Sequence, residues 1–206
     1  MKKVVFVLVC LVGCYNLWSQ EEVATVDKPS KYGFNFGINY SNLMHKGMLP
    51  SNAAIKNDWG FRMGILADYK ISELFSISPK VELSLNNSAV NFSHENNSRY
   101  KYKVMPVSVD LMSHFVFKDH KKKFSPYFLF GPNLKIPISK QNMYEIDFST
   151  RTDFALDFGI GINKKFTHFN FAPELRYSLG LLDVNLHPAI QTLKFHNITL
   201  VFNLLG

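Results

Sequence analysis

Thiol chemistry is almost absent from this sequence, because its two cysteines, Cys10 and Cys14, both lie close to the N-terminus. If that segment is removed, the mature chain has no disulfide, no thiolate nucleophile and no cysteine metal ligand. The seven histidines show no HxH or HExxH spacing, so they predict no metal site either. We therefore expect neither a cofactor nor a metal.

Long apolar runs are also missing beyond the N-terminal segment, so the sequence predicts no transmembrane helix. The net charge is +7, but Lys and Arg are spread through turns and alternating positions, with no basic helix and no zinc motif. This spread argues against nucleic acid as a partner. The aromatic fraction, 15%, is high for a soluble domain, and the charged fraction, 19%, is low.

The N-terminus has the pattern of a signal peptide, because Lys2 and Lys3 precede the apolar run Val4–Gly13, which is too short to span a membrane as a helix. Two processing patterns fit. A lipobox would place a lipid on Cys14, whereas ordinary signal peptidase would cut after Ser19. We favour the second, since the strands described below can hold the protein in a membrane. The expected division is a signal peptide over residues 1–19, a polar spacer over 20–31 and a β-barrel domain over 32–206.

The stretch Phe169–Gly180 alternates between two kinds of side chain. Its odd-numbered positions are all aromatic or apolar, and its even-numbered positions are small, polar or charged. Period-two alternation predicts a β-strand with one apolar face. The stretch is also about as long as a tilted strand needs to be to cross a bilayer.

The same pattern occurs earlier, because the stretch Phe75–Leu85 aligns with it without a gap at an offset of 94 residues. The charges at the polar positions are exchanged between the two copies. Lys80 stands where the second copy has Glu174, and Glu82 stands where it has Arg176. A second motif, FxFGxN, recurs at the same offset. We interpret the chain as two related halves of four strands each.

Eight stretches alternate in this way, and we expect them to form one all-β domain, an eight-stranded antiparallel up-and-down transmembrane β-barrel. The stretches are Tyr32–Tyr40, Trp59–Tyr69, Phe75–Leu85, Tyr102–Phe117, Pro126–Ile136, Phe154–Asn163, Phe169–Gly180 and Asn197–Leu204. Their connections are alternately long and short. Outer-membrane barrels have an even strand count, short periplasmic turns and long external loops. This topology predicts an outer-membrane location with both termini in the periplasm.

The direction of the apolar face separates a membrane barrel from a soluble lipocalin-like barrel. The interior of an eight-stranded barrel is narrow, and about five large apolar side chains per strand would not fit inside it. The polar face is rich in glycine, for example at Gly33, Gly37 and Gly64. Aromatic residues near the strand ends, among them Trp59, also fit an interfacial girdle. We therefore expect the apolar face to meet lipid.

Two features fit the barrel poorly. Prolines interrupt four of the expected strands at Pro79, Pro106, Pro132 and Pro173, and each removes one donor from a ladder. A closed barrel has no free edge, so we expect local β-bulges at these positions. The chain also ends at Gly206 without the terminal aromatic residue on which many such barrels end.

Several of these strands resemble a known family. GFNFGINYSNL, ISPKVELS, MPVSVDL, PYFLFGPNL, LDFGIGI and FAPELRYSLGL are similar to strands of the PorT-like family of small outer-membrane β-barrels, which is common in Bacteroidota. The resemblance covers nearly all of the mature chain. It implies an outer-membrane, eight-stranded barrel, and the family's namesake is an accessory of type IX protein secretion. It brings no catalytic residue pattern.

Charged residues at inward positions are the candidate site, because a buried charge needs a partner. They are Arg62, Asp68, Lys80, Glu82, Asp110, Asp157, Glu174 and Arg176. The third and seventh strands face each other across an eight-strand ring. We therefore expect Lys80 to pair with Glu174 and Glu82 with Arg176, and Arg62 to meet Asp157 or another carboxylate. Such a network would be a structural plug, and a path for protons or ions is the alternative.

The expected function is that of a non-enzymatic outer-membrane barrel, a scaffold or partner in an envelope complex, with protein secretion as one such role. Its partners would be outer-membrane lipid and envelope or secretion proteins, contacted through the loops Met44–Asp58, Asn87–Arg99 and Lys140–Arg151. One alternative is a lipid-modifying enzyme that uses His114 and Asp110 on the inner face of the fourth strand. The other is the soluble lipid-binding barrel.

Overall fold

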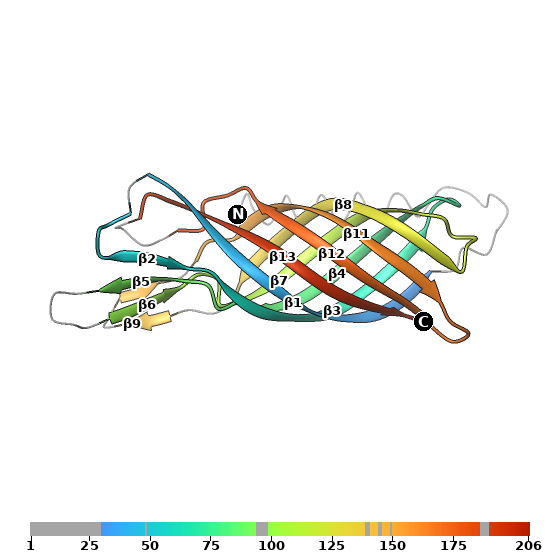
Figure 1. Ribbon diagram of the computed structural model, residues 1–206, viewed down its shortest axis with the longest axis horizontal. Coiled ribbons are helices and arrows are strands. Elements are labelled where there is room, and N and C mark those ends of the chain that lie inside the picture. The colour runs from blue at the N-terminus through green and yellow to red at the C-terminus, as the bar shows by residue number, and fades with distance from the viewer. Residues whose placement is uncertain are drawn as a thin grey trace, which may run out of the picture.

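A closed barrel of eight antiparallel strands forms the body of the protein (Figure 1). The computed structural model describes residues 30–47, 49–93, 99–138, 141–143, 146–148, 150–185 and 190–206. The barrel strands are β1 (Lys31–Lys46), β3 (Asp58–Lys70), β4 (Phe75–Leu85), β7 (Val107–Lys118), β8 (Phe124–Pro137), β11 (Asp153–Lys165), β12 (Asn170–Gly180) and β13 (Thr192–Leu205). The predicted fold class is confirmed.

The polar side chains of the strands point into the barrel and the apolar ones point outward, as the alternation predicts. On β1 the amide of Asn35 is buried at 2% exposure, whereas on β3 the neighbouring outward residue Ile65 is 65% exposed. Glycine lets the strands approach, because a Cβ on Gly37 would overlap the backbone oxygen of Leu200 on β13. The polar face therefore lines the lumen, and the soluble barrel with an apolar interior is wrong.

The connections alternate as expected. Short turns join β3 to β4, β7 to β8 and β11 to β12 at one end of the barrel, which we call the turn end. Longer segments join the other consecutive barrel strands at the opposite end, the loop end. Gly33 near the start of β1 pairs with Leu205 at the end of β13, so both chain ends of the barrel lie at the turn end.

The loop end carries regular structure that the sequence did not predict. Strands β2 (Ala53–Lys56), β5 (Ala89–Ser93) and β6 (Arg99–Lys103) form a three-stranded sheet in the order β2-β5-β6. Strands β9 (Gln141–Met143) and β10 (Ile146–Phe148) form a hairpin. Figure 1 shows these small strands beyond one end of the barrel.

The predicted strand Tyr102–Phe117 is wrong at its start. Strand β7 begins at Val107, and the chain bends before it, at Val104–Pro106. Met105 has a positive φ of 48°, which ends the extended conformation directly before the proline. Pro106 therefore lies outside the barrel wall and breaks no ladder.

Prolines inside the wall remove rungs without shifting the register, so the expected bulges are wrong there. Between β3 and β4, Leu66 pairs with Lys80 and Tyr69 pairs with Ile77. The register is the same on both sides of Pro79, and two rungs between them are missing. Ladders β7–β8 and β11–β12 lose two rungs in the same way at Pro132 and at Pro173.

The expected signal peptide and the Cys14 lipobox lie outside the described residues, as does the spacer except for its last two residues, Ser30 and Lys31. The barrel itself begins at Lys31. Across the described part of the chain, no helix is both long and apolar enough to span a membrane.

Candidate functional site

The candidate residues all point into the lumen. Each of the eight is at most 6% exposed. They come from β3, β4, β7, β11 and β12, which together cover most of the ring. The structure therefore gathers them as one buried group, whose members are Arg62, Asp68, Lys80, Glu82, Asp110, Asp157, Glu174 and Arg176.

Both expected pairs between β4 and β12 are present. The Nζ of Lys80 lies 2.9 Å from Oε2 and 3.1 Å from Oε1 of Glu174. The Nη2 of Arg176 lies 2.6 Å from Oε2 of Glu82. Because β4 and β12 are four strands apart in the ring, these bonds cross the lumen and hold opposite walls together.

Arg62 does not meet Asp157 but binds other carboxylates, which was the second of the two expectations. Its Nη1 lies 2.9 Å from Oε2 of Glu82, and its Nη2 lies 3.4 Å from Oδ2 of Asp110. The strands explain this choice, because β4 and β7 follow β3 in the ring whereas Asp157 lies on the far side, on β11. Glu82 thus joins two arginines, one from each half of the barrel.

Asp157 is the centre of a second group of contacts. Its carboxylate accepts a hydrogen bond from Ser178 at 2.5 Å and from Asn133 at 3.1 Å, and it lies 3.1 Å from Nε2 of His114. Nε of Arg176 lies 3.8 Å away. The histidine and the serine therefore bind the same carboxylate, and neither is bonded to the other.

This arrangement differs from the enzyme alternative. His114 was paired there with Asp110, but the structure places Asp110 beside Arg62 and Ser108 and gives His114 to Asp157. His114 has no exposed surface. A hydroxyl activated by a base needs a hydrogen bond between the two, and Ser178 donates to the carboxylate instead.

Further charged residues take part that the sequence analysis did not name as site residues. Lys118 on β7 pairs with Asp68 near the turn end. Lys135 on β8 donates to Asn197 at 2.9 Å and lies 4.0 Å from Asp153. Alternation placed Lys135 on the inward face, whereas Lys118 directly follows the predicted strand end at Phe117; extending the alternation by one residue was the available signal. Their partners depend on the stagger of the strands, which alternation does not fix.

The remaining lumen volume is small. Asn35 donates to Glu82 at 2.9 Å, and the phenol of Tyr127 donates to Glu174 at 3.1 Å. Between the Lys80–Glu174 pair and the turn end lies a cavity of about 20 Å³, room for about one water molecule. In the part of the chain that the structure describes, no cluster of three or more His, Cys, Asp or Glu side chains could hold a metal ion.

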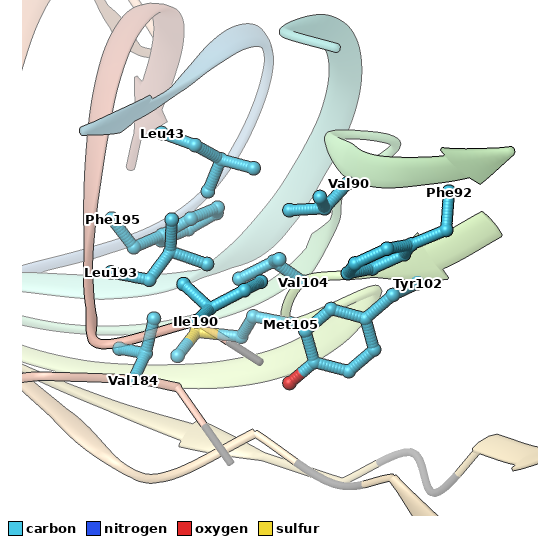
Figure 2. Close-up of a cluster of buried hydrophobic side chains, with 10 residues drawn as sticks. All are labelled: Leu43, Val90, Phe92, Tyr102, Val104, Met105, Val184, Ile190, Leu193 and Phe195. Atoms are coloured by element: carbon cyan, nitrogen blue, oxygen red, sulfur yellow. The ribbon is translucent and has the colours of Figure 1, made fainter. Parts of the chain in front are cut away.

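An apolar core covers the lumen at the loop end, and we call it the cap. Figure 2 shows its ten buried side chains, which come from β1, β13 and the connections between barrel strands. They are Leu43, Val90, Phe92, Tyr102, Val104, Met105, Val184, Ile190, Leu193 and Phe195. Lys135 lies 5.1 Å from the centre of the Phe195 ring, so the charged network and the cap are in contact.

The small sheet is part of the cap. Leu49, Ala53 and Ile55, at and before β2, pack against its core. Below them, Asn86 accepts a hydrogen bond from Asn39 at 2.6 Å and donates one to the backbone oxygen of Met105 at 2.9 Å. The described parts of the first two predicted contact loops therefore lie on or beside a folded layer that is bonded to the barrel wall.

Residues 18–185 match the family model described as Outer membrane protein beta-barrel domain. The match covers most of the chain. The chain belongs to this family. No curated protein matches it.

One solved structure with a TM-score above 0.5 shares the fold of this barrel, and two others match it with lower scores. Neisserial surface protein A is 12% identical, with a TM-score of 0.53 over 86% of this chain and 98% of that chain. Ail of Yersinia pestis, solved with the heparin analogue sucrose octasulfate, is 14% identical, with a TM-score of 0.46 over 86% and 99%. OprG of Pseudomonas aeruginosa is 14% identical, with a TM-score of 0.46 over 85% and 91%. At these identities the likeness concerns the fold alone.

The family explains why the outward face is apolar. In an outer-membrane barrel the outward residues of the wall meet lipid, and the outward aromatic rings pack on one another there. Phe115 and Phe130 lie 5.2 Å apart between ring centres, and Tyr40 and Trp59 lie 5.1 Å apart. The polar side chains are instead placed in the lumen, where they bind one another.

Proposed function

We propose that the protein is a non-enzymatic scaffold of the outer membrane whose loop end binds a protein partner in an envelope complex. The observation that carries the proposal is the cap, a folded layer with its own apolar core on a barrel whose lumen is filled. Binding sites are often built on loops that a rigid scaffold positions. Here the loops are positioned by the sheet β2-β5-β6 as well.

The filled lumen favours a role as a scaffold and argues against a role as a channel. Ion pairs cross the lumen between β4 and β12, and the cap lies above them. Eight-stranded barrels have an interior that side chains can fill, whereas porins of sixteen or more strands leave a channel. The network then serves as a plug that fixes the barrel's shape, not as a path for ions.

The burial of the histidine–carboxylate pair supports a non-enzymatic role. His114 and Asp157 have no exposed surface, so a lipid substrate would need to displace the wall or the cap to reach them. The enzyme alternative depended on His114, and this histidine offers no acid–base pair that a substrate could reach.

The orientation of the barrel in the membrane and its N-terminal targeting segment belong to the same proposal. The turn end, with both chain ends of the barrel, lies in the periplasm, and the loop end faces outward. Residues 1–19 are a signal peptide cut after Ser19, and 20–31 are a spacer. The resemblance to the PorT-like family of Bacteroidota favours type IX protein secretion as the process that the complex serves.

Cross-linking in intact cells tests the proposal. A tagged wild type is compared with Ala54→Glu/Lys56→Glu, which alters two exposed positions of β2, and with Lys122→Glu, an exposed turn-end control. All three must be outer-membrane proteins whose gel mobility shifts on heating. We expect one partner to be captured by the wild type and by Lys122→Glu, and at least tenfold less by the β2 variant. Equal capture by all three, or no specific partner for the wild type, would refute it.

Deleting the gene tests the secretion role separately. If the complex serves type IX secretion, cargo proteins of that system should accumulate inside the cell, and a plasmid copy should restore their release. Normal secretion in the deletion strain would remove this role and leave the scaffold proposal standing.

A further inference from the structure

Two grooves open on the lipid-facing side of the barrel wall. The first has a volume of about 380 Å³ and lies between β3 and β4. The second has a volume of about 580 Å³ and lies between β11 and β12, reaching to β8. Most of the side chains that line each groove are apolar and belong to the outward face, and a few inward residues lie at the bottom.

The two grooves occupy the same place in the two halves of the barrel. Three consecutive residues of β4, Pro79–Val81, line the first groove, and Pro173–Leu175 of β12 line the second. Opposite them stand Ile65–Ala67 of β3 and Ile160–Ile162 of β11. A feature that recurs in both halves with different side chains reflects the backbone and not one chance rotamer.

Both grooves lie where a proline interrupts a ladder. A proline has no N–H to donate, so the ladders lose their pairs at Pro79 and at Pro173. On the lumen side of β4, the hydroxyl of Ser78 donates to the backbone oxygen of Ala67 at 2.9 Å, in place of the amide that Pro79 lacks. The position that matches Ser78 in the second half is Ala172, which has no hydroxyl to make this bond. The groove in that half is the larger of the two.

The floor of both grooves is the same ion pair. Lys80 lines the first groove and Glu174 lines the second, and they bind each other across the lumen at 2.9 Å. Their charges therefore neutralise each other, and neither groove presents an unpaired charge to its occupant. The small outward residue Ala67 adds depth, because it is 9% exposed although Ile65 beside it on the same face is 65% exposed.

The depth of the grooves selects the lipid leaflet. Pro79 is four residues and Pro173 three residues from the turn-end start of its strand. At about 3.3 Å per residue and a tilt of about 40°, this is roughly 10 Å along the barrel axis for Pro79 and roughly 8 Å for Pro173. With the turn end in the periplasm, the grooves lie among the acyl chains of the periplasmic leaflet, which is the medium that covers the apolar wall around them.

We propose that each groove is a binding site for one acyl chain of a phospholipid from the periplasmic leaflet. The chain fills the space that the missing rungs leave between two strands and packs against the carbon atoms of the proline ring and its neighbours. The inference goes beyond the scaffold function, because it concerns the wall of the barrel and not its loop end.

Counting retained lipids tests the proposal. Native mass spectrometry is done on the barrel extracted from outer membranes, with detergent washes that remove the bulk lipid. The wild type should keep two phospholipids. Ala67→Phe, which fills the first groove, should keep one. Val109→Phe adds the same ring at an outward position outside both grooves and should keep two.

Photo-cross-linking of the wild type gives a result that does not depend on the folding of any variant. Phosphatidylethanolamine with a diazirine on one acyl chain is incorporated and activated, and the adducts are mapped by peptide sequencing. Adducts should be at least threefold enriched on Ile65–Ala67 and Ile160–Ile162 over Phe36 of β1 and Phe115 of β7, two outward residues that line neither groove. Adducts spread evenly around the wall, or equal lipid counts for wild type and Ala67→Phe, would overturn the proposal.

Discussion

Replacing Glu174 with glutamine should destabilise the barrel more than replacing its partner Lys80 with methionine. Glu174→Gln leaves the buried ammonium of Lys80 without the carboxylate that binds it through both oxygens. Lys80→Met leaves Glu174 with three other groups: the phenol of Tyr127 at 3.1 Å, Asn203 at 3.3 Å and Nη1 of Arg176 at 3.6 Å. The two halves of one ion pair are therefore not equivalent.

The magnitudes follow from what each variant leaves unpaired. A buried charge that loses its partner costs about 3–5 kcal/mol, which we expect for Glu174→Gln. Loss of hydrogen bonds to a charged group that keeps other partners costs about 1.5–3 kcal/mol, which we expect for Lys80→Met. The double variant buries no unpaired charge. It should be more stable than Glu174→Gln alone, which requires a coupling energy larger than the cost of Lys80→Met, about 3 kcal/mol.

The assay is urea unfolding and refolding of the protein in phospholipid vesicles. The fluorescence of Trp59 and the heat-dependent gel shift report the folded fraction, and the free energy of unfolding is compared for the wild type, both single variants and the double variant. If the double variant is destabilised by the sum of the two single effects, Lys80 and Glu174 do not interact and the cross-lumen pair is refuted.

Reversing the charges gives a weaker rescue than the sequence alone suggests. Glu174→Lys should impair folding, and adding Lys80→Glu should restore the pair. The structure also puts Arg176 3.6 Å from Oε1 of Glu174, so a lysine there would stand beside a second cation. We expect Lys80→Glu to restore part of the folded yield; no rescue at all would count against the contact.

Three further changes address other parts of the barrel. Gly161→Ala should cost about 1–3 kcal/mol of unfolding free energy in the same assay, because its Cβ would overlap the ring of Tyr127, whereas Gly159→Ala, with its nearest neighbour at 3.0 Å, should cost less. Phe195→Ala in the cap should cost about 3–5 kcal/mol and expose the loop end to protease while the gel shift persists. Burial lowers the pKa of His120, in the turn after β7, to about 4. The unfolded chain then takes up this proton first as the pH falls from about 6.5, so stability should fall between pH 6.5 and 4, and less so in His120→Gln.

The wall of the barrel could be predicted because each strand carries its own signal. Lipid on one side and a narrow lumen on the other impose strict alternation, and this is why Phe169–Gly180 and its seven counterparts were found. The pairs of Lys80 and Glu82 with residues of β12 could be predicted because an eight-strand ring fixes which strands face each other.

Contacts that depend on the stagger of the strands could not be predicted. Alternation says that Lys135 and His114 point inward, but it does not say which carboxylate lies at the same height. The structure gives His114 to Asp157, 43 residues away, because the levels of β7 and β11 are set by the tilt of the whole barrel. The enzyme alternative would have used His114 together with Asp110, which lies on the same strand.

The cap had no sequence signal of its own. Its core residues come from two separate connections, β4–β7 and β12–β13, and from β1 and β13, for example Val90, Tyr102 and Val184. Each connection is polar on average and contributes only a few apolar side chains, so none shows the periodicity of a strand that packs on a core. The prolines misled for a related reason. A proline removes one hydrogen-bond donor whether the strand forms a bulge or only loses rungs. A bulge would shift the register, and the register on the two sides of Pro79 is unchanged.

The two repeated halves explain why the charges are exchanged. Lys80 and Glu174, and likewise Glu82 and Arg176, bind each other at a separation of 94 residues, which is the repeat offset, so each pair joins the same position of both halves. If the halves were identical, each of these positions would meet its own copy, and two like charges would face each other in a buried space. A stable lumen therefore requires the halves to differ at this layer, and opposite charge at matched positions is the difference that turns repulsion into a bond between the walls.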